Sequence, residues 1–361
     1  MSIISDFYDK YDGHEESYLQ IIFNKLKDEN TDGLIYLAGD SSLDNKHWLK
    51  PPYTTEKRVN AVNGYETIPN FDTSGCIQDV AYHINNEINE FNKIHSKEIK
   101  MACINTSIEA TKLANRKDYN DDGSNFLSSD KFIFDHITNK DTLIVSVGGN
   151  DIALGPTLEI QQKFGLLASD LTNPDAISYF KNMFEVDLVN YIKKLIKKNT
   201  PKNIIICMVY YPYAGTDQSG FAQGTLSRLG YNSNQTLLKS IINLFYTFIQ
   251  NIQKDKLIEN TNIIPCPLFE VLDLNNKNHY YNSVEPSEVG GRLMAKNFFW
   301  LIRYKMKYFK YIFDKSKQDE TRIYLDNHII DLAKESKELN NGDEWNNTYY
   351  KFLDKGIRLH L

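Results

Sequence analysis

Two short motifs place chemically useful side chains directly after apolar runs. The run from Leu34 to Ala38 stops at Gly39-Asp40-Ser41, so a serine hydroxyl lies where a buried strand gives way to a turn. A second run, Thr142 to Val147, is followed by Gly148-Gly149-Asn150-Asp151. The glycines allow a tight turn, and the Asn150 amide can donate to an oxyanion. Together the motifs indicate a serine nucleophile with an oxyanion donor.

Each motif also has a purely structural interpretation. Ser41 is a residue type that commonly caps a helix N-terminus, and Asn150 and Asp151 could cap the helix after a glycine turn. We favour the chemical interpretation because the second motif repeats the arrangement of the first, at the end of another apolar run.

The elements that must hold these motifs follow from hydrophobic periodicity. Amphipathic helical patterns at 77–91, 184–198 and 235–252 alternate with short, continuously apolar runs, which we predict to be strands at 34–38, 99–104, 142–147, 203–209 and 262–266. This alternation is typical of a parallel sheet covered on both faces, and it predicts a doubly wound three-layer α/β/α fold. Ligands bind beyond the carboxyl ends of strands in such folds.

The chain divides in this interpretation into a helical lead-in (1–30), an α/β domain (31–305) and a helical extension (306–361). Two long segments after strands, 153–179 and 210–234, are expected to be loops that form walls around a substrate, although disordered insertions are the alternative. An apolar stripe with surrounding lysines at 298–317 is expected to pack on the core, and contact with an anionic membrane surface is the less favoured alternative.

Composition excludes several classes of function. A formal net charge of -6 argues against a protein that binds nucleic acid by neutralising phosphates. Four cysteines without C-x-x-C spacing are expected to be core residues, and no phosphate-binding loop or metal-ligand spacing follows a predicted strand, so we expect no cofactor and no metal. The first residues lack a secretory signal pattern and no run could span a bilayer, which predicts a soluble intracellular protein.

The motifs Gly39-Asp40-Ser41-Ser42 and Gly148-Gly149-Asn150-Asp151 resemble those of the SGNH hydrolases, the GDSL esterase and lipase family. The resemblance covers roughly residues 30 to 305 and implies a flavodoxin-like sandwich with a five-stranded parallel sheet. It further implies that Ser41 is the nucleophile and that its own N–H and Asn150 donate to the oxyanion. Where the family has glycines after the second strand, this chain has Ser107 and Ala110, and the Ala110 N–H could still donate to an oxyanion because a backbone N–H survives the change from glycine to alanine. Glu109 is then expected to point away from the oxyanion or to pair.

The final block departs from the family pattern, which is Asp-x-x-His-Pro. The register set by Pro286 puts Asn282 at the aspartate and Glu285 at the histidine. A buried glutamate whose pKa is raised could still remove the serine proton, and it would need no anionic support. Two histidines could serve instead: His279, which Glu285 would orient, and, less favoured, His47.

The sequence therefore leads to two hypotheses. The first is a serine esterase that hydrolyses an O-acyl ester, such as an acetylated sugar or a lipid, through an acyl-enzyme on Ser41. Its catalytic residues would be Ser41, Glu285, Asn150, Ala110 and His279. The second is a catalytically inactive binding or assembly protein that keeps the fold, and the replaced base pair motivates both hypotheses.

Overall fold

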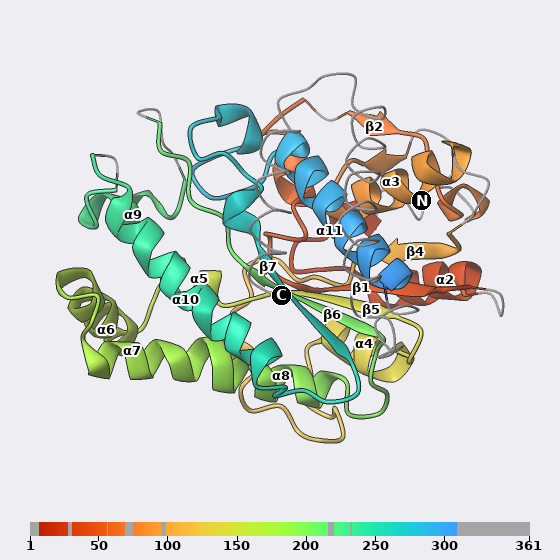
Figure 1. Cartoon of the computed structure of the whole chain (residues 1–361). Coiled ribbons are helices and arrows are strands. Elements are labelled where there is room, and N and C mark those ends of the chain that lie inside the picture. The colour runs from red at the N-terminus through yellow and green to blue at the C-terminus, as the bar shows by residue number, and fades with distance from the viewer. Residues whose placement is uncertain are drawn as a thin grey trace, which may run out of the picture. The chain divides into compact units, whose positions relative to one another are not determined.

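The computed structural model describes residues 7–308 except 28–30, 56, 69–74, 95–98, 216–219 and 232, and the side chains as far as residue 303. A central five-stranded parallel sheet organises these residues (Figure 1). In chain order its strands are β1 (Gly33–Gly39), β4 (Met101–Ile104), β5 (Thr142–Ser146), β6 (Asn203–Met208) and β7 (Asn262–Pro267). A small antiparallel pair, β2 (Arg58–Val59) and β3 (Cys76–Ile77), lies outside this sheet.

Helices connect the strands. They are α2 (Glu16–Leu26), α3 (Val80–Ile94), α4 (Ser128–His136), α5 (Gly149–Ala153), α6 (Leu158–Ser169), α7 (Pro174–Lys181), α8 (Leu188–Leu195), α9 (Gln223–Arg228), α10 (Thr236–Lys254) and α11 (Glu288–Tyr308). A π-helical segment, η4 (Asn182–Asp187), joins α7 to α8, and 3-10 turns occur at η1 (Lys46–Leu49), η2 (Tyr65–Thr67), η3 (Leu113–Arg116), η5 (Leu268–Glu270) and η6 (Lys277–His279).

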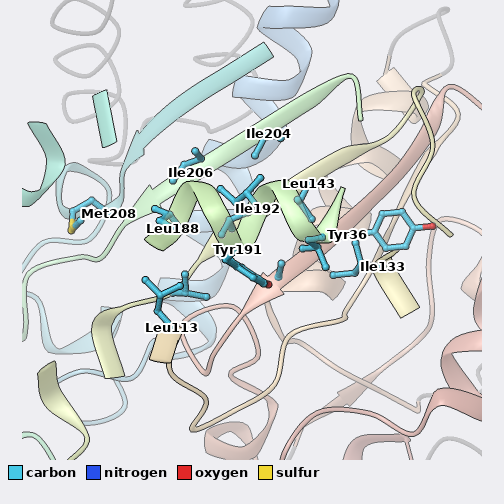
Figure 2. Close-up of a cluster of buried hydrophobic side chains, with 14 of the residues drawn as sticks. Tyr36, Leu113, Ile133, Leu143, Leu188, Tyr191, Ile192, Ile204, Ile206 and Met208 are labelled. Atoms are coloured by element: carbon cyan, nitrogen blue, oxygen red, sulfur yellow. The ribbon is translucent and has the colours of Figure 1, made fainter. Parts of the chain in front are cut away.

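Successive side chains of each strand point to opposite faces of the sheet. Tyr36, Leu143 and Ile206 belong to the core cluster under α8, which Figure 2 shows with Leu188 and Tyr191 of that helix. The intervening residues point to the opposite face, because successive side chains of a strand alternate. Asn85 of α3 bonds to the backbone of Cys103, and Asn297 of α11 bonds to Cys266 Sγ, which places both helices on that second face. The three-layer α/β/α prediction is thus confirmed.

The order of strands across the sheet is β4-β1-β5-β6-β7. In chain order this is 2-1-3-4-5, the flavodoxin-like arrangement, as the resemblance implies. The order reverses between β1 and β5, which pair from Ile35 and Thr142 to Gly39 and Ser146. Doubly wound folds bind ligands at such a reversal, beyond the carboxyl ends of the strands. Ser41 follows β1 and Asn150 follows β5, so both lie at this point.

The prediction that segments 153–179 and 210–234 are loops was wrong in part. Segment 153–179 contains α6 and the start of α7, and segment 210–234 contains the short α9. The helix α6 packs through apolar side chains, which include the buried Ile160, Phe164 and Leu167.

All four cysteines are buried free thiols, as predicted. The chain divides into two compact units, Met1–Phe299 and Trp300–Leu361, and the candidate site lies in the first. The predicted helices of 318–361 lie outside the described residues, and the three-part division at 30 and 305 stays a prediction. No described helix has both the length and the apolarity needed to cross a membrane.

Candidate active site

Ser41 occupies a tight turn directly after β1. The Asp40 carbonyl accepts hydrogen bonds from the backbone N–H groups of Leu43 and Asp44, and the Asp40 carboxylate accepts the Ser42 N–H at 2.9 Å. Asp40 therefore caps this turn, and no α-helix begins there, since η1 starts at Lys46. The Ser41 hydroxyl is not used as a helix cap and is available for another partner.

That partner is Glu285. The Ser41 Oγ donates to Glu285 Oε1 at 3.2 Å, across 244 residues of sequence. Burial raises the pKa of the Glu285 carboxyl to about 8, and the nearby Asp40 and Glu109 carboxyls act in the same direction. The hydrogen bond from Ser41 and the neighbouring Trp48 indole N–H oppose this shift. The structure thus brings together the two residues on which the sequence-based hypothesis depends.

Glu285 is held by Asn282, the residue at the family's aspartate position. The Asn282 Oδ1 accepts the backbone N–H groups of Val284 at 2.9 Å and of Glu285 at 3.0 Å. An aspartate would accept the same bonds but would add a buried negative charge next to a carboxyl that already lies in a low-dielectric site. A neutral amide therefore suits a site with a carboxyl in place of an imidazole.

Asn150 lies at the start of α5, after a left-handed Gly148 (φ 99°). A Cβ on Gly148 would come within 2.7 Å of the Phe184 ring, so glycine is needed both for this conformation and for this contact. The Asn150 side-chain N–H donates to the Thr111 carbonyl at 3.1 Å. Asp151 accepts the backbone N–H groups of Leu113 and Ala114, and so caps the adjacent η3 turn.

Ala110 has the backbone conformation that favours glycine. Its φ is 56°, in the left-handed region, which glycine adopts more readily than a residue with a side chain. Ala110 is not among the residues that line the cavity beside Ser41 in the described part of the chain.

The two histidines considered as bases are engaged elsewhere. The ring of His279 lies between the Asp273 backbone N–H at 3.0 Å and the Asn276 amide at 3.1 Å. His47 contacts the Tyr53 hydroxyl at 3.1 Å, within a group of aromatic rings that includes Trp48 and Tyr281. Neither His279 nor His47 is brought to Ser41 by a described contact.

A buried ionic cluster next to the site escaped the sequence analysis. The Lys46 ammonium, which is 0% exposed, binds Asp44 Oδ2 and Glu109 Oε1, each at 2.5 Å. Glu109 also accepts the Gly13 N–H, and Asp44 accepts from the Asn105 amide and lies 3.4 Å from His14. The expected pairing of Glu109 is confirmed.

Opposing effects set the protonation of this cluster. Burial alone would raise the pKa of Asp44, but the Lys46 ammonium outweighs it and holds that pKa well below its usual range. Burial would lower the pKa of Lys46, and the Asp44 and Glu109 carboxylates raise it instead. The pKa of Glu109 is raised by burial and by Asp44 to about 8. A sequence pattern does not show that a charged side chain is buried when a partner such as Glu109 lies in a distant segment. No sequence signal therefore identified Lys46.

A cavity of about 890 Å³, including its open mouth, begins at Ser41. The polar residues at one end are Asp40, Ser41, Ser42, Asn150 and Glu285. The remainder is lined mainly by apolar side chains from β6, α6, η4, α9 and α10. Among the described residues, no group of three His, Cys, Asp or Glu side chains is arranged to hold a metal ion.

No protein-family model and no curated protein matches this sequence. Several solved structures are similar to it. One is assigned as an arylesterase, from Agrobacterium tumefaciens (11% identity, 75% of this chain and 98% of that chain, TM-score 0.40). Another is a catalytic mutant of Axe2, an acetylxylan esterase from Geobacillus stearothermophilus (13%, 74% and 93%, TM-score 0.38). A third is an extracellular lipase from Streptomyces rimosus (11%, 74% and 99%, TM-score 0.35).

Proposed function

We propose that this protein is a serine esterase that uses a Ser41–Glu285 dyad. The observation that carries the proposal is the 3.2 Å hydrogen bond from Ser41 Oγ to a buried carboxyl whose pKa is raised to about 8. A serine hydroxyl is a weak nucleophile until a base accepts its proton, and a base works best when its pKa lies near the working pH. Glu285 meets both requirements without a histidine.

In the proposed reaction, Glu285 accepts the Ser41 proton while Oγ forms a bond to the ester carbonyl carbon. The tetrahedral oxyanion receives hydrogen bonds from the Ser41 N–H and from Asn150, whose amide nitrogen carries a second hydrogen besides the one bonded to Thr111. The Ala110 N–H is a third candidate donor. The Glu285 proton then passes to the departing alkoxide, and the acyl group stays on Ser41. Water then attacks the acyl group while Glu285 accepts its proton. Glu285 returns this proton to Ser41 Oγ as the carboxylic acid leaves.

The alternative is a binding protein that has lost catalysis. It is favoured by the same raised pKa, because a carboxyl with a pKa of about 8 is mostly protonated at pH 7 and cannot then act as a base. The two functions differ in whether the carboxylate form of Glu285 is used at all.

The discriminating experiment is hydrolysis of p-nitrophenyl esters by purified protein at pH 8.5, a value chosen so that Glu285 is largely ionised. We expect turnover by the wild type and a loss of at least about 100-fold in kcat/KM for Ser41→Ala. Ser42→Ala is the matched control, because that hydroxyl bonds to Ser146 at 2.7 Å and not to Glu285. Equal rates for the wild type and Ser41→Ala would leave the binding protein as the better explanation.

A further inference from the structure

We infer that the cavity beside Ser41 binds the acyl chain of the substrate, and that the esters hydrolysed carry medium- or long-chain fatty acyl groups in preference to acetyl groups. The inference rests on the proposed function, because it takes Ser41 as the attacking residue. It goes further in naming the chemical class of the acyl group, which neither the motifs nor the dyad determines.

The cavity changes character along its length. Its polar groups gather at the strand ends, where the carbonyl carbon of an ester would meet Ser41. Tyr210 lines the cavity too, but its hydroxyl donates to the Val284 carbonyl at 2.7 Å, and it therefore contributes mainly its ring. Among the described lining residues, Asp40 and Glu285 are the charged ones, and both belong to the Ser41 end.

Away from Ser41 the wall is hydrocarbon. It is formed by Phe164 of α6, Phe184 of η4, Leu226 of α9 and Phe245 of α10, and the rings of Phe184 and Phe245 stack with centroids 4.7 Å apart. Such a wall offers almost no hydrogen bonds, so it would leave the hydroxyls of a sugar without partners at a high free-energy cost. An alkyl chain has no hydrogen bonds to lose in this cavity, and its transfer out of water is favourable.

The extent of the apolar wall favours a chain of many carbons. The wall runs over α6, η4, α9 and α10, whereas an acetyl group has a single methyl to place there. Each buried methylene is expected to raise kcat/KM by roughly threefold, provided its contacts are also made in the transition state.

The test compares p-nitrophenyl acetate, butyrate and octanoate at pH 8.5. We expect kcat/KM to rise on the order of 1000-fold from acetate to octanoate, which has six more methylenes to bury. Octyl acetate, assayed by release of acetic acid, tests whether the chain binds on the alcohol side instead. The inference is overturned if the acetate is the best p-nitrophenyl ester, or if octyl acetate is preferred to p-nitrophenyl octanoate.

Two variants of α9 localise the effect. Thr225 is half-buried and lines the cavity, so Thr225→Trp should reduce the octanoate-to-acetate ratio of kcat/KM at least tenfold. Ser227→Trp, on the same helix but exposed and outside the cavity, should leave that ratio unchanged. If Thr225→Trp does not fold, as judged by its thermal unfolding, Leu229→Trp provides the same test from a second lining position. An unchanged ratio in a folded variant contradicts the inference.

A measurement of decanoate binding distinguishes a failure of this inference from a failure of the proposed function. Ser41→Ala should bind decanoate, measured by calorimetry, and Thr225→Trp in that background should weaken the binding. Decanoate binding together with no ester hydrolysis by the wild type would overturn the esterase but leave the cavity assignment intact. Hydrolysis without chain-length preference and without decanoate binding would overturn the cavity assignment but leave the esterase.

Discussion

Glu285 combines two properties that usually exclude each other, since it is buried and yet must become charged to act. Water cannot stabilise its anion, and the neighbouring Asp40 and Glu109 carboxyls oppose ionisation further. Among the described residues, the Ser41 hydroxyl donates a hydrogen bond to Oε1, and Oε2 has no hydrogen-bond partner within bonding distance. A carboxyl in this position holds its proton to unusually high pH, so folding stability and catalysis should respond to pH in opposite directions.

The first prediction concerns stability. The folded pKa of Glu285, about 8, lies above the ordinary value near 4.5, so between these values the folded protein binds a proton that the unfolded chain has released. The stabilising contribution is complete below pH 4.5 and is lost as the pH rises to 8. Glu285→Gln keeps the shape of the protonated carboxyl, but its side chain does not ionise. Relative to this variant, the wild type should lose on the order of 5 kcal/mol of unfolding free energy from pH 4.5 to pH 9, measured by urea denaturation. Parallel pH curves for both proteins would refute the assignment.

The second prediction concerns Ala110, which is held at a φ of 56°. A left-handed conformation costs an L-residue roughly 1 to 2 kcal/mol, whereas glycine adopts it freely but loses more entropy on folding. Ala110→Gly should therefore raise the free energy of unfolding by about 0.5 to 1 kcal/mol. Ala114→Gly, in the nearby η3 turn, is the control and should lower it. Destabilisation by both substitutions would mean that Ala110 is not strained.

At the scale of elements, ion pairs connect the turn after β1 to the segment before η3. Lys46, from η1, lies between Asp44 of the Ser41 turn and Glu109 of the Ala110 segment. Glu109 also reaches back to Gly13, which ties in the N-terminal segment. The ionic cluster thus links the Ser41 turn to the Ala110 segment, beside the backbone hydrogen bond from Ile108 N–H to the Gly39 carbonyl.

The third prediction tests this role. Lys46→Met removes the cation and leaves Asp44 and Glu109 buried without a counter-ion, so it should cost about 3 to 5 kcal/mol of unfolding free energy at pH 8. The loss should shrink at pH 5, where the carboxyls can take up protons. Lys197→Met, which breaks an exposed pair with Asp121, should have little effect at either pH. A small, pH-independent effect of Lys46→Met would show that the cluster does not stabilise these segments.

At the scale of the whole molecule, the features that the sequence predicts are those that short stretches of residues determine. The five strands are short apolar runs, and each lies within two residues of its predicted bounds. Their order across the sheet was implied by the resemblance to a flavodoxin-like sandwich and not by the apolar runs themselves. The pairing of Ser41 with Glu285 could be inferred because a family register aligned both residues to known roles.

The rest depends on contacts between distant segments. Lys46 could not be recognised as buried, because its partner Glu109 comes from a different loop, 63 residues away in the sequence. Residues of the two segments predicted to form walls, 153–179 and 210–234, do line the cavity beside Ser41, but its apolar character was not predicted, because α6 and α9 were interpreted as loops. His279 was placed in the site because it is close to Glu285 in sequence, and its ring contacts Asp273 and Asn276.

The most direct test of a Ser41–Glu285 dyad is the rate at which a fluorophosphonate probe reacts covalently with Ser41, followed by mass spectrometry from pH 6 to pH 10. We expect one adduct, on Ser41, whose rate of formation rises about tenfold per pH unit and levels off above pH 8, where Glu285 is ionised. In Glu285→Gln the rate should fall at least about 100-fold and lose this pH dependence. An adduct on another residue, or a Glu285→Gln rate equal to that of the wild type, would contradict the dyad.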